Sequence, residues 1–97
     1  MAGTRTIEKL NAESIRGWLA SHKGWKRQAN KLTKDFVFPS FRDSIVFVNR
    51  IASVADSNNH HPDIDIRYTK VLLHLSTHSA GGITKMDVQL AQAIDAP

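Results

Sequence analysis

The first quarter of the chain has apolar residues spaced as on one face of an amphipathic helix. Ile15, Trp18 and Leu19 stand at positions i, i+3 and i+4, which share a helical face. Asn11 precedes them and suits the N-cap, because its side-chain oxygen can accept a hydrogen bond from a backbone N–H of the first turn. We expect a helix that begins after Asn11 and ends at Gly24.

The segment 25–38 changes to the two-residue period that is typical of a β-strand. Leu32, Phe36 and Phe38 fall on one face of such a strand, and the residues between them alternate onto the other. Ala29-Asn30 interrupts the pattern with residues that suit a turn. The segment is therefore predicted to form a β-hairpin.

A second helix is predicted over residues 41–56. Ser40 suits its N-cap, and Asp43 stands at the third helical position, where an acid is favourable. Its apolar stripe is wider than one contact needs and comprises Phe41, Ile45, Phe47, Val48, Ile51, Ala52, Val54 and Ala55. We expect one face against the helix's own sheet and another against a second subunit.

Two further strands are predicted between residues 63 and 77. Pro62 restricts His61 to an extended conformation. The apolar residues then change parity once, from Ile64, Ile66 and Tyr68 to Val71, Leu73 and Leu75. Either a bulge or a tight turn produces such a change. We favour a turn near Thr69-Lys70, which gives strands over 63–68 and 70–77.

The C-terminal segment predicts a third helix and completes the fold class. Gly81-Gly82 ends the sheet, and Thr84 with Asp87 three residues later resembles a capping box. The order αββαββα predicts an α+β fold, with a four-stranded antiparallel sheet and three helices packed on one face. A length of 97 residues suits a single domain over 1–97, of which we expect 1–9 to be flexible.

Composition excludes several classes of protein. The chain has no cysteine, so disulfide scaffolds, thiolate metal sites and cysteine nucleophiles are excluded. It has no secretory h-region or bilayer-length apolar run, so we expect a cytoplasmic protein without membrane contact. The net charge is +4, and an acid-free basic stretch spans 23–34. Apolar residues dilute this stretch, so we interpret it as a solvated surface rather than a nucleic-acid site.

Histidine is the unusual residue of this sequence. Four of the five histidines fall within nineteen residues: His60, His61, His74 and His78. Consecutive extended residues point to opposite sides, so His60 and His61 could hold two sides of a ligand. His78 precedes a glycine-bearing loop, where functional groups are often mounted. Imidazoles exchange protons near neutrality, so the cluster suits general acid–base catalysis, with Asp56, Asp63 or Asp87 to orient the rings.

Each of these residues also has a simpler explanation. Asp87 could serve only as a helix cap, His74 as a structural or surface residue, and Tyr68 as a packing residue. A zinc or iron site is disfavoured because adjacent histidines are awkward ligands and no H-x-x-x-H spacing is present. Ser76, Thr77 and Ser79 flank His78, but no G-x-S-x-G nucleophile motif exists.

Taken together, these residues form a multi-point motif. The run Asp56-x3-His60-His61-Pro62-x5-Tyr68-x9-His78-x8-Asp87 closely resembles the signature of the pterin-4a-carbinolamine dehydratases. The similarity extends over about three quarters of the chain, from Gly24-Trp25 through FVFPSF to LAQAID. The αββαββα order also resembles the fold of that family.

The resemblance implies a function and a set of site residues. The substrate would be a 4a-hydroxytetrahydropterin, left by an aromatic amino acid hydroxylase, and the products quinonoid dihydropterin and water. His60, His61 and His78 match the family's catalytic histidines, and His60, Pro62 and Asp87 would bind substrate. The family needs no metal or other cofactor, and its members form homodimers or homotetramers. Ile64 replaces the tryptophan of animal members, which puts any contact of that indole in doubt.

Two alternatives from other classes remain open. The chain could be a non-catalytic interaction or dimerisation module that uses the broad face of the helix over 41–56. It could also bind a pterin or act as an assembly factor without turnover. A dehydration assay with histidine variants would distinguish these from an enzyme.

Overall fold

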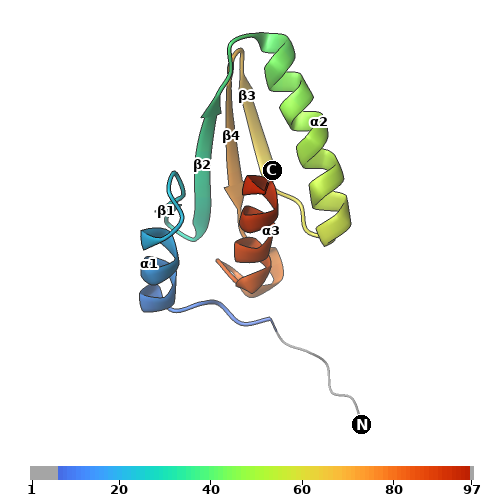
Figure 1. Ribbon diagram of the computed structural model, residues 1–97. Helices are drawn as coiled ribbons and strands as arrows, with labels where there is room; N and C mark the ends of the chain where they lie inside the picture. The colour runs from blue at the N-terminus through green and yellow to red at the C-terminus, as the bar shows by residue number, and fades with distance from the viewer. Residues whose placement is uncertain (1–6, 97) are drawn as a thin grey trace.

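The structure, a computed structural model that describes residues 7–96, contains three α-helices and one four-stranded antiparallel sheet (Figure 1). The sheet has the order β1-β2-β4-β3, and a short 3-10 helix, η1, follows β4. This arrangement confirms the predicted α+β fold and the order αββαββα. The elements are α1 (Ala12–Ala20), β1 (Lys26–Gln28), β2 (Lys31–Val37), α2 (Phe41–Asn58), β3 (Asp63–Arg67), β4 (Lys70–Leu75), η1 (His78–Ala80) and α3 (Lys85–Asp95).

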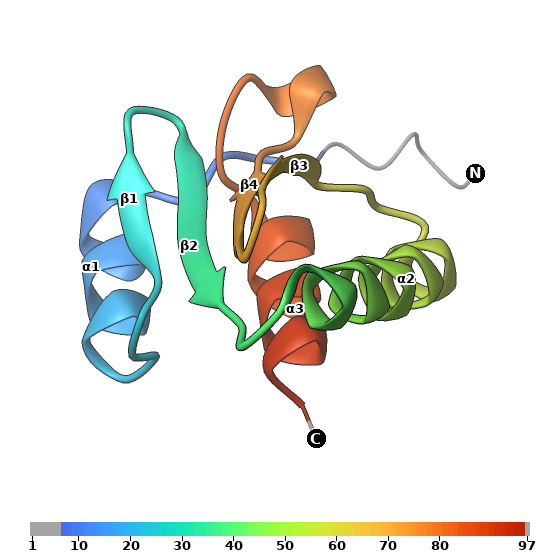
Figure 2. The same ribbon diagram turned by 90° about the horizontal axis from the view of Figure 1, so that it is seen from above.

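All three helices contribute to a core on one face of the sheet. Alternation along the strands directs Leu32, Val71, Leu73 and Leu75 to that face, where they are fully buried. Ile15 of α1, Ile51 of α2, and Leu90, Ala91 and Ile94 of α3 belong to the same apolar cluster. Figure 2 shows α2 and α3 together on one side of β3 and β4, below them in this view, with α1 beside β1. The opposite face of the sheet carries polar side chains such as Thr33 and His74, which are paired in register.

The first helix ends earlier than predicted, at Ala20 rather than at Gly24. Two polar side chains lie within hydrogen-bond distance of a carbonyl oxygen of its last turn. Ser21 Oγ is 3.2 Å and His22 Nδ1 is 2.7 Å from Trp18 O. Gly24 has a φ of +90° and lies in the turn that follows. The glycine therefore marks a left-handed position in the connection, not the end of the helix.

The parity change between β3 and β4 is a turn, as favoured above. Arg67 pairs with Lys70, so Tyr68 and Thr69 form the turn, one position before the predicted one. Tyr68 has a φ of +55°. The strands are shorter than predicted and end at Arg67 and Leu75, with Thr77 forming an isolated bridge to Gly82.

The second helix runs two residues beyond the predicted 56, to Asn58. Ser40 caps it, since its side chain accepts a hydrogen bond from Asp43 N at 3.1 Å. Ile51 is fully buried, and Phe47 packs against Phe36 of β2, with ring centroids 4.6 Å apart. Val46 faces away from the sheet and is 62% exposed. The predicted contact of this outer face with a second subunit stays a prediction.

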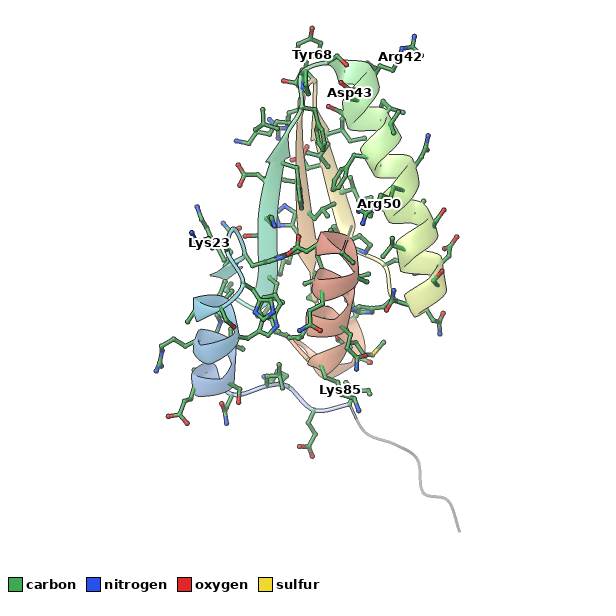
Figure 3. All side chains as sticks on the ribbon, viewed as in Figure 1. Lys23, Arg42, Asp43, Arg50, Tyr68 and Lys85 are labelled. Carbon is green, nitrogen blue, oxygen red and sulfur yellow. The ribbon has the colours of Figure 1, made fainter. Side chains whose placement is uncertain are left out.

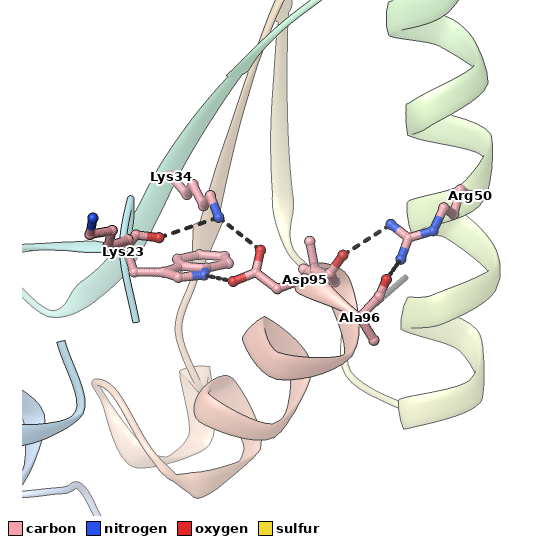
Figure 4. A network of polar contacts seen from close by, with 7 residues as sticks. Lys23, Lys34, Arg50, Asp95 and Ala96 are labelled. Atoms are coloured by element: carbon pink, nitrogen blue, oxygen red, sulfur yellow. Dashed lines mark hydrogen bonds and ion pairs between the residues drawn. The ribbon is translucent and has the colours of Figure 1, made fainter. Parts of the chain in front are cut away.

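The C-terminal end of α3 is bound to two other elements (Figure 4). Asp95 accepts hydrogen bonds from Trp25 Nε1 at 2.7 Å and from Lys34 Nζ at 2.8 Å. Arg50 of α2 donates to the carbonyl oxygens of Ile94 and Ala96. These contacts fix α3 relative to the hairpin and to α2, and α3 carries Asp87 at its opposite end.

The segment before α1 runs alongside the loop that precedes α3. Leu10 N donates a hydrogen bond to Ile83 O at 2.8 Å. The predicted flexibility of residues 1–9 falls largely on 1–6, which lie outside the described residues. Over the part of the chain that the structure describes, no helix combines the length and apolar character that crossing a bilayer requires.

Candidate active site

The motif residues gather mainly at one end of the sheet. His60 and His61 lie between α2 and β3, whereas His78 follows β4. Because β3 and β4 are antiparallel neighbours, the start of β3 and the end of β4 lie at the same end of the sheet. Asp87 lies in the first turn of α3, just after the loop that starts at this end of the sheet.

His60 and Asp87 form a buried pair at this end of the sheet. Nε2 of His60 lies 2.6 Å from Oδ1 of Asp87. The imidazole is 11% exposed, and the carboxyl group is fully buried. A buried carboxylate without hydrogen-bond partners is costly, so this contact fixes the ring of His60 and satisfies one oxygen of Asp87.

The second oxygen of Asp87 belongs to the cap of α3. Oδ2 accepts hydrogen bonds from the Thr77 hydroxyl and from Thr84 N, both at 2.9 Å. Thr84 and Asp87 form a capping box, in agreement with the sequence pattern. The expected helix cap at Asp87 is thus confirmed, and its other oxygen contacts the ring of His60. A role of Asp87 toward a substrate stays a prediction.

His61 contacts a different helix from His60 and is exposed to solvent. Its Nε2 atom is 2.9 Å from Oδ1 of Asp56, near the end of α2. The side chains are 61% and 77% exposed, respectively. The rings of His60 and His61 thus bind carboxylates of two different helices. Because it is exposed, His61 is accessible to a small molecule.

His78 begins η1 and is exposed. It lines a cavity of about 140 Å³ together with Lys31, Asp63 and Ser76. Neither His60 nor His61 is among the residues that line this cavity. The structure therefore brings His60 and Asp87 into contact. His78 directly follows Thr77, whose hydroxyl also binds Asp87. The structure does not place the three imidazoles around that one cavity.

The remaining residues singled out from the sequence lie in different environments. Pro62 is half-buried directly before β3. His74 lies on the helix-free face of the sheet, opposite Asp63. Tyr68 is at the far end of the molecule from Lys85, the first residue of α3 (Figure 3), and its ring stacks on Phe41 with centroids 6.3 Å apart. Tyr68 therefore lies in the β3–β4 turn, remote from Asp87, and is 73% exposed.

One residue of the site was missed by the sequence interpretation. Thr77 was considered only as a possible nucleophile beside His78, yet its hydroxyl binds the carboxylate that holds His60. A lone threonine at a strand end carries no distinctive sequence signal. Within residues 7–96, no group of three or more His, Asp or Glu side chains is arranged to hold a metal ion.

Comparison with known proteins places these residues in a family. The family model for pterin 4 alpha carbinolamine dehydratase matches residues 8–97. The chain belongs to the pterin-4a-carbinolamine dehydratase family. A relative from Sulfurisphaera tokodaii, provisionally named as such a dehydratase, is 46% identical over 92% of this chain and 96% of its own. Another provisionally named dehydratase, from Roseiflexus castenholzii, is 50% identical over 89% of this chain and 92% of its own.

Solved structures agree with the fold of this pterin-4a-carbinolamine dehydratase family member. A transcriptional coactivator/pterin dehydratase from Brucella melitensis is 27% identical, covers 91% of this chain and 96% of its own, and superposes with a TM-score of 0.85. A pterin dehydratase-like protein described as a RuBisCO assembly factor in the alpha-carboxysome is 21% identical. It covers 78% of this chain and 95% of its own, with a TM-score of 0.58, and this likeness shows the fold alone.

Proposed function

We propose that this protein dehydrates 4a-hydroxytetrahydropterins to quinonoid dihydropterin and water by general acid–base catalysis with histidines. Family membership over residues 8–97 supports the reaction class. The observation that carries the proposal to this chain is the buried contact between His60 and Asp87, beside the exposed histidines 61 and 78. A fixed imidazole with accessible ones nearby is suited to binding a ring and moving its protons.

The reaction needs one acid and one base. The bond between carbon 4a and its hydroxyl oxygen breaks, and the oxygen leaves with the electron pair after an acid protonates it to water. A base removes a proton from a ring nitrogen, and the electron pair of that N–H bond forms the new C=N double bond. No electrons enter or leave overall, so neither a redox cofactor nor a metal is required by the balance of the reaction.

The burial of the histidines supports a division of roles. We assign proton transfer to His61 and His78, because both are exposed. His60 binds and positions the pterin, since its Nε2 atom is engaged with Asp87 and its ring is only 11% exposed. Pro62 sets the path of the chain at the pocket, and Asp87 acts on substrate through His60.

The cavity beside His78 is too small to enclose the whole substrate. Its volume is about 140 Å³, whereas pockets that bury a drug-sized ligand start at roughly 300 Å³. We infer that the pterin lies partly in this cavity and partly across the surface toward the histidine pair at 60 and 61. Such an open site would release water readily.

The proposal extends to the setting of the reaction. The substrate would come from an aromatic amino acid hydroxylase that uses tetrahydropterin, and the reaction would take place in the cytoplasm as part of tetrahydrobiopterin recycling. We propose a homodimer or homotetramer, because Phe41 and Val46 leave apolar surface on the outer face of α2, 48% and 62% exposed. Neither nucleic acid nor membrane is a proposed partner.

A dehydration assay tests the enzyme directly. The rate of quinonoid dihydropterin formation from freshly generated carbinolamine is measured with wild type and with His61→Ala/His78→Ala. Wild type should accelerate the reaction, and the double variant should lose most of that acceleration. His22→Gln is the matched control, because His22 follows α1, where its Nδ1 atom lies 2.7 Å from Trp18 O, and it does not line the cavity beside His78. If wild type and the double variant both follow the uncatalysed rate, the protein is not this enzyme.

A second candidate function is protein interaction. The Brucella melitensis structure is described as a coactivator as well as a dehydratase. On α2 of this chain, a hollow of about 350 Å³ is lined by Phe41, Ile45 and Val46 together with the polar Arg42 and Asn49. Loss of a partner on Val46→Glu, with binding unchanged by the histidine substitutions, would favour this function. Tight pterin binding without turnover would instead identify a pterin-binding factor.

A further inference from the structure

Thr77 connects the segments that carry two of the proposed active-site histidines. It is buried, 4% exposed, between the end of β4 and the start of η1. Its side chain contacts the carboxylate that holds His60, and its backbone closes the turn that carries His78. Resting on the proposed function, we propose that Thr77 is a positioning residue that sets the placement of both imidazoles.

The side chain of Thr77 acts on His60 through Asp87. A hydroxyl has one hydrogen to donate, and that of Thr77 is donated to Asp87 Oδ2 at 2.9 Å. The 2.7 Å contact between the Thr77 and Thr84 hydroxyls must then be a donation from Thr84. Thr84 Oγ1 in turn accepts from Met86 N at 3.1 Å. These bonds all run toward Asp87, and hydrogen bonds in such a chain strengthen one another.

This directed chain determines how His60 presents its ring. Asp87 accepts hydrogen bonds from Thr77 and Thr84 on one oxygen, so this oxygen serves as an acceptor only. The other oxygen accepts a hydrogen bond from the Nε2–H group of His60, 2.6 Å away. The Nδ1 atom is left to face a ligand. Loss of the Thr77 hydroxyl removes one of the three donors to Asp87 and loosens the carboxylate that fixes this orientation.

The backbone of Thr77 acts on His78. Thr77 N donates to Gly82 O at 2.8 Å, and Thr77 O accepts from Gly81 N at 2.9 Å and from Ala80 N at 3.1 Å. The turn enclosed by these bonds begins with His78. Because threonine is β-branched and stiff at χ1, the same residue fixes the turn and the direction of its hydroxyl. The two histidines therefore share one point of attachment.

A merely structural role is the competing explanation, since any buried hydrogen-bonded threonine stabilises a fold. The experiment must separate lost stability from lost positioning. Thr77→Val keeps the shape and removes the hydroxyl, whereas Thr77→Ser keeps the hydroxyl. Thr33→Val makes the same change on the opposite face of the sheet. Ile15→Val lowers stability at a buried site in α1, remote from Asp87.

The measurements are kcat and KM for dehydration, unfolding by urea, and the proton NMR resonance of the His60 Nε2–H, assigned with His60→Gln. Thr77→Val should lower kcat about 10-fold, equivalent to about 1.4 kcal/mol, with little change in KM, and should shift or broaden the resonance. Thr77→Ser should restore both readouts. Thr33→Val and Ile15→Val should leave both near wild type.

The proposal is overturned if folded Thr77→Val keeps the wild-type resonance and kcat, or if Thr77→Ser loses as much kcat as Thr77→Val. If Thr77→Val does not fold, Thr77→Cys replaces it as a weaker donor of similar volume, with an intermediate kcat and resonance expected. If wild type has no dehydratase activity, the proposed function fails. The resonance then decides the Thr77 inference alone, and an unchanged resonance overturns it.

Discussion

Nε2 of His60 lies 2.6 Å from Oδ1 of Asp87, although the two residues are 27 positions apart in the sequence. One belongs to the loop before β3 and the other to the first turn of α3. The contact therefore links the packing of α3 against the sheet to the orientation of a proposed active-site ring. A change that displaces the start of α3 will also displace His60.

The burial of this contact predicts unequal costs for two adjacent substitutions. His60→Ala leaves an oxygen of the fully buried Asp87 unpaired, which should lower the free energy of unfolding by about 1–3 kcal/mol. His61→Ala removes an exposed contact with Asp56, which should cost less than about 1 kcal/mol. Urea unfolding of the two variants checks the difference. Equal costs would show that the His60 contact is not maintained in solution.

The turn between β1 and β2 predicts a stabilising substitution. Ala29 is exposed and has a φ of +54°, a left-handed conformation that is unfavourable for residues with a Cβ atom. Ala29→Gly should raise the free energy of unfolding by up to about 1 kcal/mol. Ala52→Gly, at an exposed position inside α2, should instead lower it by about 1 kcal/mol. Thermal unfolding distinguishes the two, and destabilisation by Ala29→Gly would contradict the turn conformation.

The anchor at the C-terminal end of α3 predicts a measurable loss of stability. Asp95→Ala removes the acceptor of the indole N–H of Trp25, a residue that is 4% exposed, and the partner of Lys34. Leaving a buried donor unpaired should lower the free energy of unfolding by about 1–3 kcal/mol. Glu8→Ala, at an exposed acid, is the control and should change it little. A neutral Asp95→Ala would show that the network in Figure 4 contributes nothing measurable.

An exposed pair on β3 predicts a local pH effect. Hydrogen bonds from Arg67 lower the pKa of Asp65 below its ordinary value of 3.8. Because the folded pKa is the lower one, the pair stabilises the protein above that ordinary value and stops doing so as pH falls through the lowered pKa. Arg67→Gln should raise the pKa of Asp65 toward 3.8, as followed by an NMR pH titration. Lys70→Gln, which removes a partner of Asp35, should leave the pKa of Asp65 unchanged.

Most of the fold could be predicted because its signals are local. The parity change at Tyr68, the cap at Ser40 and the capping box at Thr84 each depend on residues a few positions apart. The end of α1 is also set by local contacts, but the interpretation placed it at the glycine instead. There, Ser21 and His22 compete for the carbonyl of Trp18, and the conspicuous glycine lies beyond them.

The site was only partly predictable for the opposite reason. The motif predicts which residues form the site, but the partner of each ring depends on tertiary packing. His61 binds a carboxylate only five positions away, whereas His60 reaches one on another helix. Thr77 enters the site through contacts 7 and 10 positions away, with Thr84 and Asp87, which no spacing rule signals.

One oxygen of Asp87 contacts His60 and the other caps α3, and this affects which residues a protein of this fold can lose. A protein of this fold without turnover would still need this acid to begin its last helix. It could lose the exposed His61 at little cost, but loss of His60 would require another partner for the buried oxygen of Asp87. An aspartate at this position is therefore a mark of common architecture, and the imidazoles are the better guide to whether chemistry survives.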